Sequence, residues 1–507
     1  MLSEYAKRIT SSRVYELAHK TDLLALQQLE GRLQNTILLK REDQQISFSF
    51  KVRGAYNKMA HLSREQLSQG VIASSAGNHA QGVALAAAKL GCHATIVMPV
   101  TTPQVKIDAV RGYGKKWVKI EVHGESYSDA HARASEIEEQ TGKTFIHPFD
   151  DPLVVAGQGT IGKEILDQYP ETIDAIFVAV GGGGLIAGIG AFVKSIRPDI
   201  RLIGVQAEGS TAMTQSLNQD QAVMLEQVSL FSDGTAVKQV GSQTLALCRE
   251  VVDEMITVSS DEICAAISDV YIDTRSILEP AGALSLAGLK KWTRQTGCTG
   301  KTLVSVACGA NMNFNRLRHV SERAEVGRHK EALFAITIQE ERGAFRDLCE
   351  LIGNHSVTEF NYRISDQREA HILVGLNTHG IEDGLALESQ FNSAGLKTIN
   401  LSGDEMAKTH LRHMVGGKSA HAEDELLYRF EFPERPGALM SFLSNIPSKW
   451  NISLFHYRAT GSDYGDVLVG IQGTSGHPKR LESYLEKVGF RYRSESDNPA
   501  YRLFLSS

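Results

Sequence analysis

Apolar and polar positions follow two different patterns along the chain, and the change falls near residue 330. Up to about residue 320, short apolar runs rich in β-branched residues alternate with longer stretches rich in Ala and Leu. The expected strands are 94–98, 117–122, 175–180, 202–206 and 303–307, and the segments 80–90 and 283–292 are among the expected helices. Continuous apolar strands separated by helices indicate a parallel sheet that is covered on both faces. Because ligands of such sheets bind at the carboxyl ends of the strands, the loops that follow the strands are expected to carry the site.

From residue 331 the sequence repeats itself. Residues 332–345 recur as 426–439, and 356–363 recur as 451–458, which places Tyr362 and Tyr457 95 positions apart. Each copy reads strand, glycine turn, amphipathic helix and strand, followed by a further helix and strand, and this order resembles the ferredoxin-like βαββαβ pattern. The stretch 401–423 between the copies is expected to be a helix and a linker. The predicted boundaries are therefore 1–322, 331–402, 403–424 and 425–507.

Length and composition favour a globular protein of several domains. The 507 residues exceed the ~250–300 that a single core usually reaches, and 42% hydrophobic with 22% charged residues is ordinary globular usage. A formal net charge of -6 argues against nucleic acid as the main partner. From Glu331 onward there are 24 acidic and 18 basic residues, so the whole negative excess belongs to the repeated part.

The sequence gives no sign of a membrane location. No stretch approaches the ~18–20 uncharged apolar residues that a span needs, and the N-terminus lacks the apolar run of a signal peptide. The six cysteines form no Cys-x-x-Cys pair, which is typical of reduced thiols. We therefore expect a cytoplasmic protein without a membrane partner, a nucleic-acid partner or a metal site.

Four segments carry candidate chemistry, and the first is the run 49–55 around Lys51. Lys51 follows a polar loop and is expected to begin a helix, whose positive dipole end tends to lower the pKa of an amine. A reactive amine needs such a lowered pKa to form a Schiff base. The alternative interpretation of Lys51 is a solvated surface lysine.

The second segment is the run 74–82, which follows a short apolar stretch. Small residues between a strand and a helix let backbone N–H groups approach an anion closely. Asn78 adds an amide that can bond a ring hydroxyl or a carboxylate. His79 is a candidate base, although a histidine in a first helical turn is more often a structural hydrogen-bonding group.

The third segment is the glycine run 181–184, which ends the expected strand 175–180 and leads into a helix. Four consecutive glycines before a helix form a turn that can cradle a phosphate. The run is not a P-loop, because no Gly-Lys-Ser/Thr follows it. The dinucleotide pattern fits only in its permissive form, from Gly182 to Ala187, with Glu208 placed to keep a nucleotide site open. A tight turn without a ligand is the structural alternative.

The fourth segment is centred on Cys308, which follows the expected strand 303–307. A thiol there can donate or accept a weak hydrogen bond, and a lone buried cysteine is otherwise core packing. Taken together, one amine, two anion-binding loops and a neutral polar group suit pyridoxal phosphate. Its aldehyde needs an amine, its phosphate needs backbone donors, and its ring nitrogen and 3′-hydroxyl each need a partner.

Several motifs in the same order now resemble a known family. The segments 49–55, 74–82, 146–160, 181–185 and 279–283 are similar to those of the serine/threonine dehydratases, which belong to the tryptophan-synthase-β-like class of pyridoxal-phosphate enzymes. The C-terminal repeat resembles the paired ACT-like regulatory domains of the biosynthetic threonine dehydratases. The resemblance implies an α/β fold with a two-lobed, open parallel-sheet catalytic domain, followed by two α+β ferredoxin-like regulatory domains.

The same resemblance implies roles for individual residues. Lys51 would be the catalytic lysine, and the cofactor would be held by Lys51, Asn78, Gly181, Gly182, Gly183, Gly184, Leu185 and Cys308. The substrate carboxylate would be held by Ser75, Ala76, Gly77, Asn78 and His79. The substrate would be L-threonine, with L-serine as a second one, and threonine would yield 2-oxobutanoate and ammonia in the first step of isoleucine biosynthesis. The family further implies a homo-oligomer, namely a tetramer.

Each copy of the repeat offers an apolar segment that ends in Tyr-Arg, namely Tyr362-Arg363 and Tyr457-Arg458. The arginine could pair with an effector carboxylate, and an apolar pocket could hold a branched side chain. The resemblance implies isoleucine as a feedback inhibitor and valine as a counter-effector. The alternative is a pair of core strands whose arginines reach solvent.

Other functions stay open beside this one. A serine-preferring dehydratase or an amino-acid racemase would use the same scaffold, although such forms usually resemble this chain without the long paired C-terminal region. A ligand-sensing protein with an inactive catalytic domain is disfavoured by the intact Lys51, Asn78 and glycine run. A dinucleotide oxidoreductase is disfavoured by the merely permissive glycine pattern and by Lys51.

Overall fold

The computed structural model describes residues 1–341, 343–364, 368–422, 424–433, 438–444, 450–458, 464–472, 483–486 and 490–505. The chain divides into two compact units, Met1–Ala324 and Glu325–Ser507. Each unit has its own sheet system and its own hydrophobic core. Among the described residues, no helix has the length and apolar character needed to cross a membrane.

The first unit contains two sheets. The larger has six strands in the order β1 (Leu23–Ala25), β2 (Thr36–Arg41), β10 (Thr302–Ala307), β7 (Ala175–Ala179), β8 (Arg201–Ala207) and β9 (Glu254–Val258), all parallel except for the antiparallel pair β1–β2. The smaller has four parallel strands in the order β5 (Val118–Val122), β4 (Ala94–Met98), β3 (Val71–Ser74) and β6 (Thr144–Phe145). The expected apolar runs are therefore strands, and they are shared between two sheets rather than joined in one.

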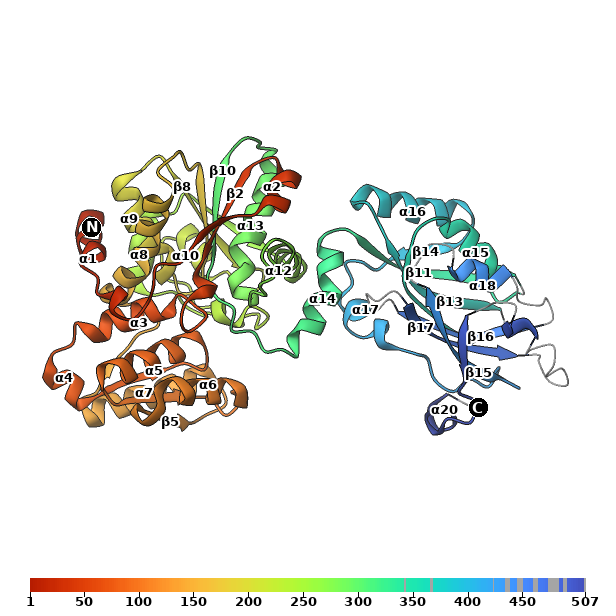
Figure 1. Ribbon diagram of the computed structural model, residues 1–507, viewed down its shortest axis with the longest axis horizontal. Helices are drawn as coiled ribbons and strands as arrows, with labels where there is room; N and C mark the ends of the chain where they lie inside the picture. The colour runs from red at the N-terminus through yellow and green to blue at the C-terminus, as the bar shows by residue number, and fades with distance from the viewer. Residues whose placement is uncertain are drawn as a thin grey trace. The chain divides into compact units, whose positions relative to one another are not determined.

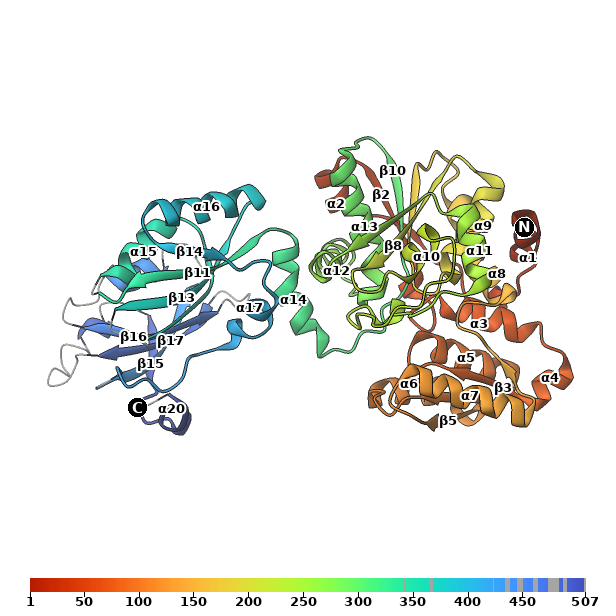
Figure 2. The same ribbon diagram turned by 180° about the vertical axis from the view of Figure 1, so that it is seen from behind.

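Helices cover both sheets. Those of the first unit are α1 (Leu2–Thr10), α2 (Gln27–Leu33), α3 (Lys51–Ala60), α4 (Arg64–Gln69), α5 (Asn78–Leu90), α6 (Gln104–Gly114), α7 (Tyr127–Thr141), α8 (Pro152–Gln168), α9 (Gly184–Ile196), α10 (Ala212–Asn218), α11 (Ser242–Val251), α12 (Ser260–Thr274) and α13 (Pro280–Thr296), and the boundary between the units falls within α14 (Arg316–Gly327). The pairs α8–α9 and α12–α13 lie on opposite sides of the six-stranded sheet (Figures 1 and 2). Helices α5, α6 and α7 gather around the four-stranded sheet as a separate lobe (Figure 1). All five residues of β7 are buried, as expected for a central parallel strand with both faces covered.

Helix α3 lies where the two lobes meet. It packs against α5 of the smaller lobe and against α8 of the larger one. The close approach to α8 depends on glycine, because a Cβ at Gly157 would lie 2.8 Å from the Arg53 carbonyl oxygen and 2.8 Å from the Gly54 Cα. The first residue of this tightly packed helix is Lys51, as the sequence predicted. The lysine backbone is therefore fixed against both lobes.

The second unit is built on one antiparallel sheet of eight strands. The order is β14 (Lys397–Asn400), β11 (Glu331–Gln339), β13 (Glu369–Asn377), β12 (Val357–Arg363), β16 (Asn451–Arg458), β17 (Tyr464–Gln472), β15 (Leu426–Pro433) and β18 (Arg491–Ser494). Its helices are α15 (Ala344–Ile352), α16 (Ile381–Ser393), α17 (Glu405–Thr409), α18 (Ala438–Ser444) and α20 (Pro499–Phe504). The first copy of the repeat has the predicted βαββαβ order in full. In the second copy, most of the segment between β17 and β18 lies outside the described residues.

The two copies are joined edge to edge through β12 and β16. In this antiparallel pair, Tyr362 lies opposite Phe455, and Phe360 lies opposite Tyr457. The rings of Phe360 and Phe455 meet at 5.5 Å between centroids, and Phe345 of α15 packs on both. One aromatic core thus spans the junction, so the copies form a single folded unit rather than two independent ones.

Candidate active site

The amine of Lys51 is held inside the first unit. Its Nζ donates a hydrogen bond to the carbonyl oxygen of Pro148 at 2.9 Å and lies 5.2 Å from the centre of the Phe50 ring. Burial lowers the pKa of Lys51 to about 8, and the nearby Cys308 and Glu279 oppose that fall without cancelling it. About a tenth of this amine is therefore unprotonated at pH 7, far more than for a lysine of ordinary pKa, and the unprotonated form is the one that a nucleophilic lysine requires.

The loop at the end of β3 leads directly into α5. Ser75, Ala76, Gly77 and Asn78 are partly exposed, and the Gly77 N–H bonds the Ser75 hydroxyl oxygen at 3.2 Å. A Cβ placed on Gly77 would find no atom within 4 Å, so the loop borders open space. The first N–H groups of a helix lack intrahelical partners. The N-terminus of α5 is thus an accessible place for a carboxylate or phosphate.

Asn78 is oriented by two partners from distant parts of the chain. Its Nδ2 donates to the Glu279 Oε1 at 2.6 Å, and its Oδ1 accepts from the Asn311 Nδ2 at 2.7 Å. Burial and, to a smaller extent, the nearby Asp233 charge together raise the pKa of Glu279 to about 7. Glu279 also lies close to Gly309, where a Cβ would come within 2.3 Å of the carboxylate oxygen. Sequence reasoning assigned no individual role to Glu279, which stood out only as the first residue of the family-like segment 279–283.

The glycine run lies between β7 and α9. Gly183 has a φ of +95°, a backbone conformation that favours glycine, and it directly precedes the first turn of α9. A Cβ on Gly182 would lie 2.4 Å from atoms of the Phe149 ring, and one on Gly184 would lie 3.0 Å from the Phe149 Cα. The turn therefore carries no side chain of its own, because neighbours such as Phe149 fill the space a Cβ would need, and Leu185 follows in the helix. This is the geometry of a loop that presents N–H groups to an anion.

Cys308 follows the last residue of β10. The side chain is buried, and its Sγ donates to the carbonyl oxygen of Ala281 at 3.2 Å. Burial raises the pKa of the Cys308 thiol, with Glu279 acting in the same direction. The thiol is therefore a neutral polar group and not a thiolate nucleophile. Its electrostatic coupling to Lys51 and Glu279 places the three groups near one another.

His79 has a structural position. Its Nε2 lies 2.7 Å from the carbonyl oxygen of Ile146, a contact in which the ring nitrogen donates. Burial lowers the pKa of His79 to about 3, with Lys51 adding to the effect, so the ring is neutral. The Nδ1 atom has no hydrogen-bond partner within the described part of the chain. These contacts favour the structural interpretation of His79 over the base.

In the second unit, the Tyr-Arg end of the first copy is engaged by protein groups. The buried Tyr362 hydroxyl donates to the Glu340 carboxylate at 2.8 Å, and burial raises the pKa of Tyr362. Arg363 pairs with Glu425 and donates to the carbonyl oxygens of Gly417 and Leu505 at 3.1 and 2.8 Å.

The equivalent end of the second copy is less fully described. Tyr457 is buried in β16, and the backbone of Arg458 lies opposite Glu359 in the β12–β16 pair. The side chain of Arg458 lies outside the described residues. The two Tyr-Arg ends therefore lie on neighbouring strands of one sheet.

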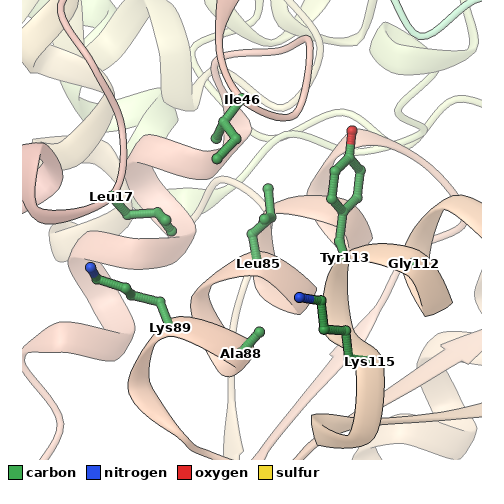
Figure 3. Close-up of a pocket in the computed structure, with 8 residues that line it drawn as sticks. All are labelled: Leu17, Ile46, Leu85, Ala88, Lys89, Gly112, Tyr113 and Lys115. Carbon is green, nitrogen blue, oxygen red and sulfur yellow. The ribbon is translucent and has the colours of Figure 1, made fainter.

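A pocket of about 360 Å³ lies elsewhere in the first unit and contains none of the predicted site residues (Figure 3). It is lined by Leu17, Ile46, Leu85, Ala88, Lys89, Gly112, Tyr113 and Lys115. Its α5 residues belong to the second half of that helix, whereas Asn78 is its first residue. The candidate site is therefore defined by the convergence of polar groups and not by this pocket.

The groups gathered around Lys51 fit pyridoxal phosphate. A backbone-lined glycine turn suits a phosphate, and an amine of lowered pKa suits an aldehyde carbon. An oriented amide and a neutral thiol complete a set of partners for the ring. Among the described residues, no group of three or more His, Cys, Asp or Glu side chains could hold a metal ion.

Comparisons with known proteins agree with this arrangement. The family of pyridoxal-phosphate-dependent enzymes matches residues 14–309, and the C-terminal regulatory domain of threonine dehydratase matches twice, at 322–411 and 416–505. The chain is 56% identical over 503 residues to the L-threonine dehydratase biosynthetic IlvA of Burkholderia multivorans, covering 99% of each chain. It is 47% identical over 505 residues to the enzyme of the same name from Escherichia coli, covering 99% of this chain and 97% of that one.

A solved structure is similar as well. The processed form of threonine deaminase isoform 2 from Solanum lycopersicum superposes with a TM-score of 0.63 at 47% identity, covering 64% of this chain and 88% of that one. Both the catalytic and the regulatory parts of the sequence are thus matched by the same kind of enzyme. The chain belongs to the biosynthetic threonine dehydratases, a family of pyridoxal-phosphate-dependent enzymes with a C-terminal regulatory region.

Proposed function

We propose that this chain is a threonine ammonia-lyase, which removes the β-hydroxyl of L-threonine to give 2-oxobutanoate and ammonia. L-serine is the second expected substrate. The observation that carries the proposal is the amine of Lys51, whose pKa is lowered to about 8 and which lies with a glycine turn and an oriented amide in one site. The names of the relatives in Burkholderia multivorans and Escherichia coli support the choice of substrate.

In this proposal the cofactor is held by the residues that resemblance assigned. Lys51 would bind the aldehyde carbon, Asn78 would bond the 3′-oxygen, and the N–H groups of Gly181, Gly182, Gly183, Gly184 and Leu185 would hold the phosphate. Cys308 would be the partner of the ring nitrogen. The bound cofactor supplies an electron-withdrawing ring that stabilises negative charge at the α-carbon of the substrate.

The substrate carboxylate is assigned to the loop from Ser75 to His79. The free N–H groups at the N-terminus of α5 and the Asn78 amide are suited to hold it. His79 would contribute only its backbone N–H, because its ring is tied to Ile146. With the carboxylate fixed there, the α-proton would be presented to Lys51, which removes it as a general base.

Cys308 bears on the outcome of the reaction. A neutral thiol supplies no negative charge to balance a protonated ring nitrogen. Charge at the α-carbon is then less stabilised, which favours rapid loss of the β-hydroxyl over reprotonation elsewhere. Cys308→Asp is expected to raise the share of racemised or transaminated product, and an unchanged product ratio would refute this role.

Regulation is proposed to reside in the second unit, with isoleucine as inhibitor and valine as counter-effector. The match of residues 322–411 and 416–505 to a regulatory domain supports this assignment. Tyr362, Arg363, Tyr457 and Arg458 stay predictions as effector contacts. Because Arg363 pairs with Glu425, an effector carboxylate would reach that arginine only in exchange for Glu425. We also propose the domain boundaries 1–322, 331–402, 403–424 and 425–507, a tetramer, and a cytoplasmic location.

A visible spectrum of the purified full chain, followed by product assays, tests the enzyme assignment. The expected result is an absorbance band of bound cofactor that changes when threonine is added, with release of 2-oxobutanoate. Faster release of pyruvate from serine would instead indicate a serine-preferring dehydratase. Formation of D-amino acid would indicate a racemase, and a missing band would refute cofactor binding.

A further inference from the structure

The segment Ile146–Asp150 lies within the family-like stretch 146–160, and its residues have no assigned part in binding the cofactor or the substrate. It follows β6 of the smaller sheet and leads into α8 of the larger lobe. Its carbonyl groups accept hydrogen bonds from the site: Ile146 from His79 and Pro148 from Lys51. The segment thus connects the two lobes and lies against both the amine and the loop at the start of α5.

Asp150 extends the same segment to a third element, α11. Its Oδ1 accepts from the backbone N–H groups of Gln243 and Thr244 at 3.0 Å each, and its Oδ2 accepts from that of Ser242 at 3.1 Å. These are the N–H groups of the first helical turn, which have no partners within the helix. A carboxylate that satisfies three of them also interacts favourably with the positive end of the helix dipole. Asp150 therefore fixes where α11 begins, although it is more than 90 positions away in sequence.

The start of α11 in turn holds the glycine turn. The buried Thr244 hydroxyl donates to the carbonyl oxygen of Gly182 at 2.7 Å. In a trans peptide group the C=O and the following N–H point in opposite directions. Fixing the Gly182 oxygen toward Thr244 therefore turns the N–H of Gly183 the opposite way, on the side away from α11. A glycine turn without this constraint is free to rotate its peptide groups, because Gly183 tolerates many backbone conformations.

Phe149 supplies a second contact between the segment and the turn. Its ring lies so close to Gly182 that no side chain larger than hydrogen fits there. The Phe149 ring also packs edge-on against the His147 ring at 4.7 Å between centroids, and this contact helps to fix its position. One side of the turn is thus set by Phe149, while the direction of its central peptide group is set by Thr244.

We propose that Asp150 is a positioning residue for the phosphate-binding turn, and that it acts through Thr244 on the peptide group between Gly182 and Gly183. This inference rests on the proposed cofactor site. Among the described residues, the hydrogen bonds of the Asp150 carboxylate go to the start of α11 and not to the Lys51 amine or the glycine turn. Its effect reaches the phosphate through the orientation of a single N–H donor. Hydrogen bonds to charged acceptors contribute enough that one misdirected donor lowers affinity by about tenfold or somewhat more.

The chain offers a matched control in the neighbouring Asp151. Its Oδ1 accepts from the N–H groups of Leu153 and Val154 at 2.8 and 3.1 Å, and its carboxylate pairs with Lys58 at 2.7 Å. Asp151 caps α8 in the way that Asp150 caps α11, but within the described part of the chain no side-chain hydrogen bond joins α8 to the glycine turn as Thr244 of α11 does. Loss of either cap should lower stability, whereas only loss of Asp150 should weaken phosphate binding.

The experiment titrates pyridoxal phosphate into the cofactor-free full chain and follows the visible absorbance and the phosphorus NMR signal of the bound phosphate. Asp150→Ala and Thr244→Val should each raise the cofactor Kd about tenfold and shift the phosphorus resonance, with the absorbance maximum unchanged. Thr244→Ser keeps the hydroxyl and should restore affinity to within about threefold of the wild type. Asp151→Ala should lower the melting temperature with a Kd near that of the wild type.

The combined variant Asp150→Ala/Thr244→Val separates the proposed route from two independent effects. If Asp150 acts through Thr244, the double variant binds the cofactor about as weakly as either single one, because one interaction cannot be lost twice. Losses that multiply to about 100-fold would overturn the route, and a wild-type Kd in Asp150→Ala would overturn the role itself. A wild-type chain that fails to bind the cofactor would instead refute the proposed function on which the inference rests.

Discussion

The surroundings of Lys51 and the Tyr-Arg end of the first regulatory copy use their polar residues in opposite ways. Around Lys51, the loop from Ser75 to Asn78 borders open space, and the glycine turn presents backbone without side chains. In the regulatory unit, the Tyr362 hydroxyl and the Arg363 guanidinium bond to protein groups. Polar groups that converge on open space indicate a ligand site, whereas buried charges that are paired with protein indicate a structural clamp.

In each copy of the repeat, a buried glutamate near the start of the first strand pairs with an arginine, and we call each such ion pair a regulatory clamp. In the first copy, Thr358 donates to Glu331, and Arg412 from the linker pairs with Glu331 at 2.8 Å. In the second copy, the equivalent glutamate is Glu425, which receives a bond from Ser453 and pairs with Arg363. The arginine of the second clamp comes from the first copy, so this ion pair ties the two copies together. The Arg363–Glu425 pair therefore neutralises a buried carboxylate and, by doing so, also links the two copies.

The largest effect is expected from Lys51→Ala, which removes the one nucleophilic amine of the candidate site. Turnover of threonine should fall at least about 1000-fold, because both the covalent attachment and the proton transfer are lost. The absorbance band of bound cofactor should also disappear from the purified protein. Retention of both the band and turnover in this variant would show that another amine does the chemistry.

A second, somewhat smaller effect concerns a buried ion cluster behind Lys51. Arg53 bonds to both oxygens of Glu42 at 2.7 Å and to both oxygens of Glu164 at 2.6 and 3.0 Å. Arg53→Met would leave these carboxylates with Lys40 as their remaining cation and should destabilise the catalytic unit by about 3–5 kcal/mol. Denaturant unfolding followed by fluorescence measures it.

The exposed pair Arg8–Glu4 provides the control for that experiment, since Arg8→Met should change stability by less than about 1 kcal/mol. Comparable losses in the two variants would mean that the cluster contributes no more than a surface ion pair.

The regulatory clamp is expected to respond to both of its partners. Arg363→Met leaves Glu425 buried without its cation and should destabilise the second unit by about 3 kcal/mol. Glu425→Gln should also destabilise it, by less, because the amide can still accept a bond from Ser453. Differential scanning calorimetry with and without isoleucine distinguishes a clamp from an effector ligand. Tighter isoleucine binding in Glu425→Gln would favour the effector assignment, because the released arginine would then be available to the carboxylate.

Removing the whole second unit tests whether the response to isoleucine resides there. A chain that ends near residue 322 should keep threonine turnover within about tenfold and lose its response to isoleucine, because the polar groups of the candidate site all precede that point. Initial rates with and without isoleucine measure it. Inhibition that persists in the shortened chain would place the effector site in the catalytic unit.

A smaller effect concerns pH. The pKa of Lys51 in the cofactor-free protein is lowered to about 8. The fraction of the amine that is unprotonated therefore rises about tenfold per pH unit below that value and levels off above it. The rate of cofactor reloading should follow this curve, with a midpoint near pH 8 rather than near 10.5. Stopped-flow absorbance between pH 6 and about 10 measures it. Glu279→Gln removes a nearby charge that raises the pKa of Lys51, so the midpoint in this variant should move somewhat below 8 and not toward 10.5.

The same lowered pKa has a consequence for stability. Between pH 8 and 10.5 the unfolded chain keeps the lysine proton that the folded chain has released, so stability should rise with pH across this window. A midpoint of reloading near 10.5 would mean that burial does not perturb Lys51.

The smallest effect is expected from Cys308→Ser. The thiol is neutral and donates to the Ala281 carbonyl oxygen, and a serine hydroxyl can make the same bond. Threonine turnover should change by less than about threefold, whereas Cys308→Asp introduces a charge into the same buried place. Steady-state kinetics of the two variants measures the contrast. A large loss in Cys308→Ser would assign the sulfur a chemical role that its raised pKa argues against.

Much of the catalytic unit followed from local sequence. The apolar runs are strands, Lys51 begins a helix, and the glycine run lies between a strand and a helix. These features depend on residues close together in the chain, where hydrophobic periodicity and backbone preferences are decisive. The roles of Glu279 and Asp150 were not predictable in this way, since their partners lie 201 and 92 to 94 positions away.

His79 and Arg363 were singled out from the sequence, but the sequence did not decide what either side chain does. The sequence left a base and a structural histidine both open for His79, and only the contact with Ile146 favours one of them. For Arg363 the sequence left open an effector contact and an arginine that reaches solvent, and in the structure Glu425 pairs with it across the junction of the two copies. In both cases, the residue type fixed what chemistry was possible, and the tertiary neighbours determined which part of it was available.

The sequence by itself determined the two-part organisation, the repeat, the order of strands and helices and the candidate cofactor residues, because each is written in local pattern or in motif spacing. Tertiary structure alone decided which polar groups face open space and which are hydrogen-bonded or ion-paired to other protein groups. Hydrogen bonds and burial depend on atoms that are brought together from distant positions in the chain. The lowered pKa of Lys51, the neutral thiol of Cys308 and the chain of contacts from Asp150 to the glycine turn all arise at that level.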